Sequence, residues 1–168
     1  MFTLDSMFAI GIFVVILVGV AWSWNLVTER IRIDNLRIDM ELSAKNAMSV
    51  LLENQGKPGN WHNKTSFTDT SVEAIGVSVS YPNIIHREKV SRLEVLNNTK
   101  YDVIQKILGI QKYDFVLNFY VYNGSSYPIK SDFEIGNASL SDTSNVVVVN
   151  RYGLIDSNWT LVRLKVWE

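Results

Sequence analysis

The chain has 168 residues, with 16 Lys and Arg against 17 Asp and Glu, a formal net charge of −1, and no cysteine. This balance provides no basic field to attract nucleic acid, so no nucleic-acid partner is expected. The lack of cysteine excludes disulfides, thiolate catalysis and cysteine-based metal sites.

The first predicted element is an apolar helix close to the start of the chain. Residues 7–24 read MFAIGIFVVILVGVAWSW, and no charged residue occurs from Ser6 to Thr28. A helix of about 20 apolar residues is long enough to cross a bilayer. The run is too long for the core of a signal peptide, and no small-residue cleavage site follows it. We therefore expect a membrane-spanning or helix-bundling segment here.

The same helix is predicted to continue as an amphipathic extension over residues 25–54, so that residues 1–54 form one element. Apolar residues recur there at spacings of three, four and seven, which is typical of one buried helical face. Gly56 and Pro58 follow and are predicted to end the helix. The main stripe comprises Leu26, Ile33, Leu36, Met40, Ala44, Ala47 and Leu51, and a second stripe that broadens it comprises Ile31, Ile38 and Leu42.

Residues 55–168 are predicted to form a globular, β-rich head. Alternating apolar residues indicate strands, and apolar residues at helical spacing indicate two short helices. The expected class is α+β, with the long N-terminal helix packed on a C-terminal antiparallel meander. The expected strands are 72–80, 113–121, a return strand over 127–135 after the Asn123-Gly124 turn, a central strand at 146–149, and 162–166; the expected helices are 87–96 and 101–108.

Asn-x-Ser/Thr sequons occur five times, all after the apolar segment. This excess favours an extracellular, glycosylated head over an Asn- and Ser-rich cytoplasmic surface. The basic residues that follow the apolar run, Arg30, Arg32 and Arg37, indicate the opposite orientation. The conflict disappears if a basic leader preceded Met1 and was removed. The candidate glycosylation sites are Asn63, Asn97, Asn123, Asn137 and Asn158.

The chain resembles type IV pilins, and most closely the archaeal branch of that family. The resemblance rests on residues 1–6 with the apolar run to Trp24, on the helix exit at 51–61, and on 106–110 followed by 113–115. It implies a mature pilin whose leader a prepilin peptidase removed before Met1. It also implies that the acid at the fifth position, Asp5, meets the amino terminus of a neighbouring subunit. Other copies of the chain, the membrane before assembly, and the pilus assembly machinery are the implied partners.

Two further observations bear on assembly. A carboxylate deep in a bilayer costs about 2.5–3.5 kcal/mol, so a buried Asp5 needs a partner; alternatively, Asp5 caps the helix at the membrane interface. Gly11 and Gly19 are eight residues apart, near one face, and either allow close helix approach or reflect the frequency of glycine in membrane helices.

No enzymatic motif is present, and we expect neither an enzyme nor a cofactor or metal. His62 and His86 are expected to be surface residues. The leading hypothesis is a structural subunit of an extracellular type IV pilus-like filament, with adhesion as one use of such a fibre. The alternatives are a single-pass membrane-anchored surface domain that binds an envelope layer or ligand, and a minor pilin or pseudopilin.

Overall fold

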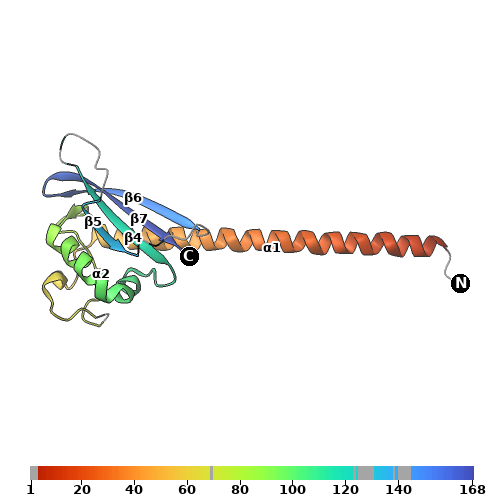
Figure 1. The fold of residues 1–168 in the computed structure, drawn as a ribbon, viewed down its shortest axis with the longest axis horizontal. Helices are drawn as coiled ribbons and strands as arrows, with labels where there is room; N and C mark the ends of the chain where they lie inside the picture. The colour runs from red at the N-terminus through yellow and green to blue at the C-terminus, as the bar shows by residue number, and fades with distance from the viewer. Residues whose placement is uncertain (1–3, 69, 123, 125–130, 138, 140–144) are drawn as a thin grey trace. The chain divides into compact units, whose positions relative to one another are not determined.

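The computed structural model describes residues 4–68, 70–122, 124, 131–137, 139 and 145–168. The chain divides into two compact units, Met1–Ile38 and Asp39–Glu168. Helix α1 (Leu4–Glu53) contributes to both, and the second unit adds helix α2 and a five-stranded sheet (Figure 1). The predicted α+β class is confirmed. The predicted boundary at residue 54 separates helix from head, whereas the second unit already begins at Asp39 and so includes the last turns of α1.

The apolar and amphipathic segments form one uninterrupted helix, as predicted. Its last turns bury the C-terminal part of the predicted main stripe, since Met40, Ala44, Ala47 and Leu51 are all at most 2% exposed. The N-terminal part is not buried within the described residues: Leu26 and Ile33 are 53% and 45% exposed, and Leu36 is half-buried. The second stripe does not broaden this buried face: Ile31, Ile38 and Leu42 each expose more than half of their surface. The buried face broadens instead through Met48 and Leu52, which are each 1% exposed.

The chain beyond α1 returns to cap the end of this helix. The last carbonyls of a helix lack partners within the helix and must be satisfied elsewhere. Here Val77 N–H donates to Leu51 O at 2.8 Å, and Asn83 N–H donates to Leu52 O at 2.9 Å. The strand predicted over 72–80 is therefore reduced to β2 (Ala74–Ile75), because the residues that follow bond to the helix end.

Trp61 anchors the loop between α1 and β2. It lies in the 3₁₀ helix η1 (Trp61–Asn63), is fully buried, and donates its indole N–H to Gly76 O at 2.9 Å. β2 pairs antiparallel with the two-residue β1 (Gly56–Lys57). A Cβ at residue 76 would lie 2.1 Å from Asn54 O, so only glycine permits this close approach to the helix end.

The two short helices predicted at 87–96 and 101–108 are joined into α2 (Arg87–Leu108). Lys100 has non-helical dihedral angles (φ −139°, ψ 29°) and marks a kink between the two predicted pieces. Gly109 ends the helix in the left-handed conformation, and its N–H bonds back to the last turn. The buried residues of α2 include Val90, Leu93 and Ile104.

The main sheet has the strand order β3-β6-β7-β4-β5. Long antiparallel pairs join β6 to β7 and β7 to β4, and β4 pairs antiparallel with β5. β3 adds a short parallel pair to β6. The strands are β3 (Ile84–Ile85), β4 (Asp114–Val121), β5 (Phe133–Gly136), β6 (Val146–Ile155) and β7 (Asn158–Trp167).

This order corrects the predicted meander, because β4 lies between β5 and β7, and β5 does not pair with β6, the next strand along the chain. It also corrects the central position predicted for residues 146–149. Among the described residues, β3 pairs with Leu154 and Ile155 of β6 and leaves the outer edge of the valines unpaired, and Val146 and Val148 are 39% and 48% exposed. The return strand is confirmed only as β5, since Tyr127 and Ile129 lie outside the described residues.

β4 is buried on both faces, whereas the alternating pattern of residues 113–121 is typical of a strand that is buried on one face only. Phe115, Leu117 and Phe119 are at most 1% exposed on one face, while Val116 and Asn118 are 4% exposed on the other. The buried Asn118 amide is satisfied, because its Nδ2 donates to a carboxylate oxygen of Glu134 at 2.8 Å.

A tyrosine joins the loop before β4 to the part of α1 that belongs to the head. Tyr113 Oη donates to Asp39 Oδ2 at 2.6 Å, and the Tyr113 side chain is only 4% exposed. Burial, followed by the interaction with Asp39, raises the pKa of Tyr113 to about 12. The neutral phenol is thus favoured in the folded state.

We predict that Tyr113→Phe lowers the free energy of unfolding by about 1 kcal/mol at pH 7, the usual net value of one hydrogen bond, because its charged partner Asp39 is exposed to solvent. The folded pKa of Tyr113 is raised, so this contribution is fully present below pH 10 and is lost as the pH rises toward about 12. Denaturant unfolding of the parent and of Tyr113→Phe should show that the difference between their free energies of unfolding shrinks over this pH range. Tyr152→Phe is the matched control, since Tyr152 is 57% exposed, and an equal loss there would contradict the assignment.

Candidate assembly segment and glycosylation sites

The apolar segment of α1 is not covered by any described part of the chain. Among the described residues, this is the helix that is long and apolar enough to cross a membrane. Every large apolar side chain in residues 7–24 is between 50% and 71% exposed, on all sides of the helix. A helix that is apolar all round belongs in lipid or among other helices.

The size of this exposed surface decides how strongly it must be covered. Burying one Val, Leu, Ile, Phe or Met side chain is worth about 1.5–3 kcal/mol. The segment carries many such side chains, so its burial is worth on the order of 20 kcal/mol or more. That exceeds the 5–15 kcal/mol that typically separates folded from unfolded states. We therefore expect this segment to be covered by lipid or by other protein helices, and not to stay exposed to water.

Gly11 forms a notch in the surface of this segment. A shallow hollow lies over it, bordered by Met7, Phe8, Ile12, Val15 and Ile16. Apart from the adjoining residues and the surrounding helix backbone, no described atom lies within 4 Å of the position that a Cβ would take at Gly11 or at Gly19. Both glycines thus present open helix backbone, which is the surface that close helix packing uses in membranes.

Two of the predicted assembly residues, Met1 and Asp5, lie at the start of the chain. Met1 lies outside the described residues, and Asp5 has a helical backbone at the start of α1. Neither the capping nor the pairing role of Asp5 is tested by this geometry, and both stay predictions.

The described sequons occupy different surroundings, while Asn123 lies outside the described residues. Asn63 is exposed at the end of η1. Asn137 accepts hydrogen bonds from the N–H and the hydroxyl of Ser139, its own sequon serine, at 3.1 and 2.6 Å. Asn63 is thus the described site with the most open side chain.

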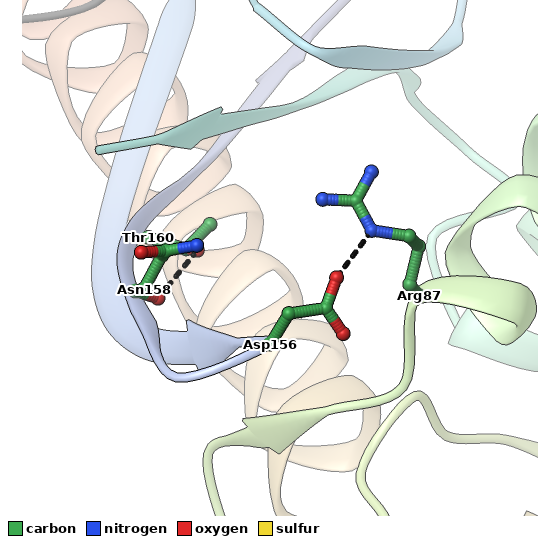
Figure 2. Close-up of polar contacts among 4 residues, drawn as sticks. All are labelled: Arg87, Asp156, Asn158 and Thr160. Atoms are coloured by element: carbon green, nitrogen blue, oxygen red, sulfur yellow. Dashed lines mark hydrogen bonds and ion pairs between the residues drawn. The ribbon is translucent and has the colours of Figure 1, made fainter. Parts of the chain in front are cut away.

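Asn158 begins β7, directly after the turn that follows β6. The hydroxyl of its sequon threonine, Thr160, donates to Asn158 O at 3.2 Å and is shown in Figure 2. Thr160 is fully buried, so an enzyme that reads this sequon must act before the head folds. In the turn, Asp156 accepts a 2.5 Å bond from Arg87 Nε and thereby ties β6–β7 to the start of α2 (Figure 2).

Asn97 is engaged in the fold of the head. It lies on α2, beside the edge strand β5, and its amide exchanges two hydrogen bonds with one backbone position. Nδ2 donates to Gly136 O at 3.1 Å, and Oδ1 accepts from Gly136 N–H at 2.9 Å. Gly136 has φ +120° and would place a Cβ 2.1 Å from Phe115 O, so glycine is required opposite Asn97. A glycan on Asn97 would compete with this pair of bonds.

Two side chains predicted to lie apart on the surface are brought together. The rings of His62 in η1 and His86 before α2 have centroids 5.5 Å apart, and Glu88 lies beside them. The sequence offers no local signal for this pairing, because the two histidines are separated by loop, β2 and β3. Only the fold of the segment that caps α1 closes the distance.

One aromatic side chain of β4, Tyr120, lies on the face opposite Phe115 and Phe119. Tyr120 is half-buried, and the guanidinium of Arg163 on β7 lies 5.5 Å from its ring centroid. Part of this ring is therefore covered by the chain itself.

Comparison of the chain with protein-family models, with curated proteins and with solved structures gives no match. The relation to type IV pilins stays a prediction from the residues. It rests on the apolar run, on Asp5 at its front, and on the exit of the helix at residues 51–61.

We predict that Asn97→Ala lowers the free energy of unfolding by about 1–3 kcal/mol, because it leaves the N–H and C=O of Gly136 without their partner. Asn98→Ala changes an exposed neighbour on the same helix and should stay within about 0.5 kcal/mol of the parent. Chemical denaturation of the full chain in detergent measures both. Equal stability of the two variants would show that the Asn97 bonds carry no net energy.

Proposed function

We propose that this chain is a structural subunit of an extracellular type IV pilus-like filament, in which bundled N-terminal helices form the core and the heads form the outer surface. The observation that carries the proposal is a single helix, α1, whose first part is apolar on every side and whose last turns are built into the head. A subunit of this kind would wait in the membrane and then exchange lipid for other copies of the helix.

The length of the exposed apolar surface favours a bundle over a simple anchor. A bilayer core is satisfied by about 20 residues of helix. In α1, apolar side chains continue beyond the run that ends at Trp24, and Val27, Ile31 and Ile38 are each at least half exposed. In a lone anchor these side chains would face water or headgroups. In a bundle of parallel helices, they would pack against neighbouring copies.

The alternative is a single-pass surface domain that stays in the membrane, or a minor pilin or pseudopilin that supports a filament without forming it. Trp22 and Trp24 at the end of the apolar run favour the anchor, because tryptophan prefers the membrane–water interface. Both readings require the membrane, and they differ in whether helices of separate copies associate.

The first test concerns Asp5. The chain would be expressed behind a cleavable prepilin leader in an archaeal host that assembles pili, and filaments would be counted by electron microscopy. We predict that Asp5→Ala lowers the filament yield about tenfold or more, because losing 1.4 kcal/mol of pairing per contact is a factor of ten. Asp5→Glu should retain filaments.

Asp34→Ala is the matched control, since it removes an exposed acid from the same helix. Unchanged filament yield in Asp5→Ala would remove the pairing role of this residue. Membrane-bound chain without filaments in the parent itself would favour the anchor.

The second test separates bundle from anchor through the second stripe. We predict that Ile31→Ser combined with Ile38→Ser strongly reduces the number of filaments. In a bundle, both isoleucines would pack against neighbouring helices, and serine removes these apolar contacts. The stability of the head should change by less than about 0.5 kcal/mol, since neither residue is buried in it. Asn35→Ser, an exposed polar position between them, is the control. An anchor predicts no effect of the double change on membrane-bound material.

A further inference from the structure

Three side chains with metal-binding groups converge where η1 meets the start of α2. His62, His86 and Glu88 each offer a nitrogen or oxygen, and these atoms all lie within 4.8 Å of one another. Both histidines are half-buried, and Glu88 is exposed at the first turn of α2. One carboxylate with two imidazoles is a ligand set found at zinc sites with an open fourth position.

The backbone that carries these side chains is held in place. His86 N–H donates to Val77 O at 2.8 Å, and His86 O accepts from Lys89 N–H at 3.1 Å. His62 lies in η1 next to the buried Trp61, whose ring meets the imidazole edge to face at 6.2 Å. The two histidines are therefore preorganised by the same segment that caps α1.

Both imidazoles have a nitrogen without a partner. The Nδ1 atoms of His62 and His86 are shielded from solvent, and neither makes a hydrogen bond within the described part of the chain. A buried polar atom left in this state costs about 1–3 kcal/mol. Such a cost is expected where a group is kept for a ligand.

We propose that His62, His86 and Glu88 form a binding site for a divalent transition-metal ion of the zinc type, with water in the fourth position. Imidazole nitrogen suits zinc, copper and nickel, whereas calcium and magnesium require oxygen ligands. Ligand atoms about 2.1 Å from a zinc ion lie roughly 3.5 Å from one another in a tetrahedron. The ligand atoms here lie within 4.8 Å of one another, so side-chain movements of about 1 Å would complete the site. The ion would join η1 to α2.

Some of the surrounding charges oppose a bound metal ion, and others favour it. The buried ammonium of Lys89 donates to Gln55 O and Ser78 O at 2.7 and 3.0 Å, and it opposes a second cation nearby. The N-terminus of α2 opposes it as well, while the carboxylate of Glu88 favours it. Burial, followed by Lys89 and His86, lowers the pKa of His62, which keeps this ring neutral and able to bind metal near neutral pH.

The chain makes the test clean, because it contains two histidines and no cysteine. Full-length protein in detergent, purified without a histidine tag, would be titrated with zinc chloride by calorimetry. We expect one zinc ion per chain. His62→Ala, His86→Ala and Glu88→Gln should each weaken binding, the histidine variants by more than about 100-fold, the upper range for loss of an outer-shell partner alone.

Asp102→Asn removes an exposed acid from the same helix and should leave zinc affinity unchanged. Cobalt absorption of the unaltered chain is a second measurement that needs no variant, and four-coordinate binding to imidazole should give visible bands. The proposal is overturned if the parent binds no zinc and shows no cobalt bands. It is also overturned if folded Glu88→Gln and both histidine variants bind as tightly as Asp102→Asn.

Discussion

The need to cover the apolar surface of α1 is the main physical constraint on this molecule. The helix continues without a break from a segment that is exposed on every side to turns that are fully buried in the head. Nothing in the described chain covers the first segment, and the free energy of covering it exceeds the usual stability of a domain of this size. The head therefore includes only the last turns of α1, and the remaining surface of this helix needs lipid or other helices to cover it.

The way the head holds that helix is specific. Met40, Ala44 and Leu51 supply the apolar contact, but the carbonyls at the helix end are satisfied by the returning segment, through Val77 and Asn83. Gly76 allows this segment to approach the helix end, and Trp61 fixes the loop that leads to it. The same segment aligns His86 with His62. Packing of the helix, the shape of the loop and the candidate metal site are thus consequences of one local arrangement.

The sequence predicted the features that depend on local periodicity. The stripe through Met40, Ala44 and Leu51 and the strand at β4 follow from spacings of 3.6 and 2, and both are observed. It failed where distant partners decide the outcome. Residues 77 and 78 alternate like a strand but bond to the end of α1. The valines at 146–149 resemble a central strand, but no described strand pairs with their outer edge. The approach of His62 to His86 has the same origin, since no pattern in the chain encodes which loops meet.

The capping of α1 by residues 77–83 also has a mechanical meaning. Any pull along the helix reaches the rest of the head through the main-chain bonds at Leu51, Leu52 and Asn54, in addition to the side-chain packing of the last turns. Tension at the helix end would then be shared among several backbone hydrogen bonds that lie close together. If the helix carries a mechanical load, these hydrogen bonds would help to keep its end attached to the head.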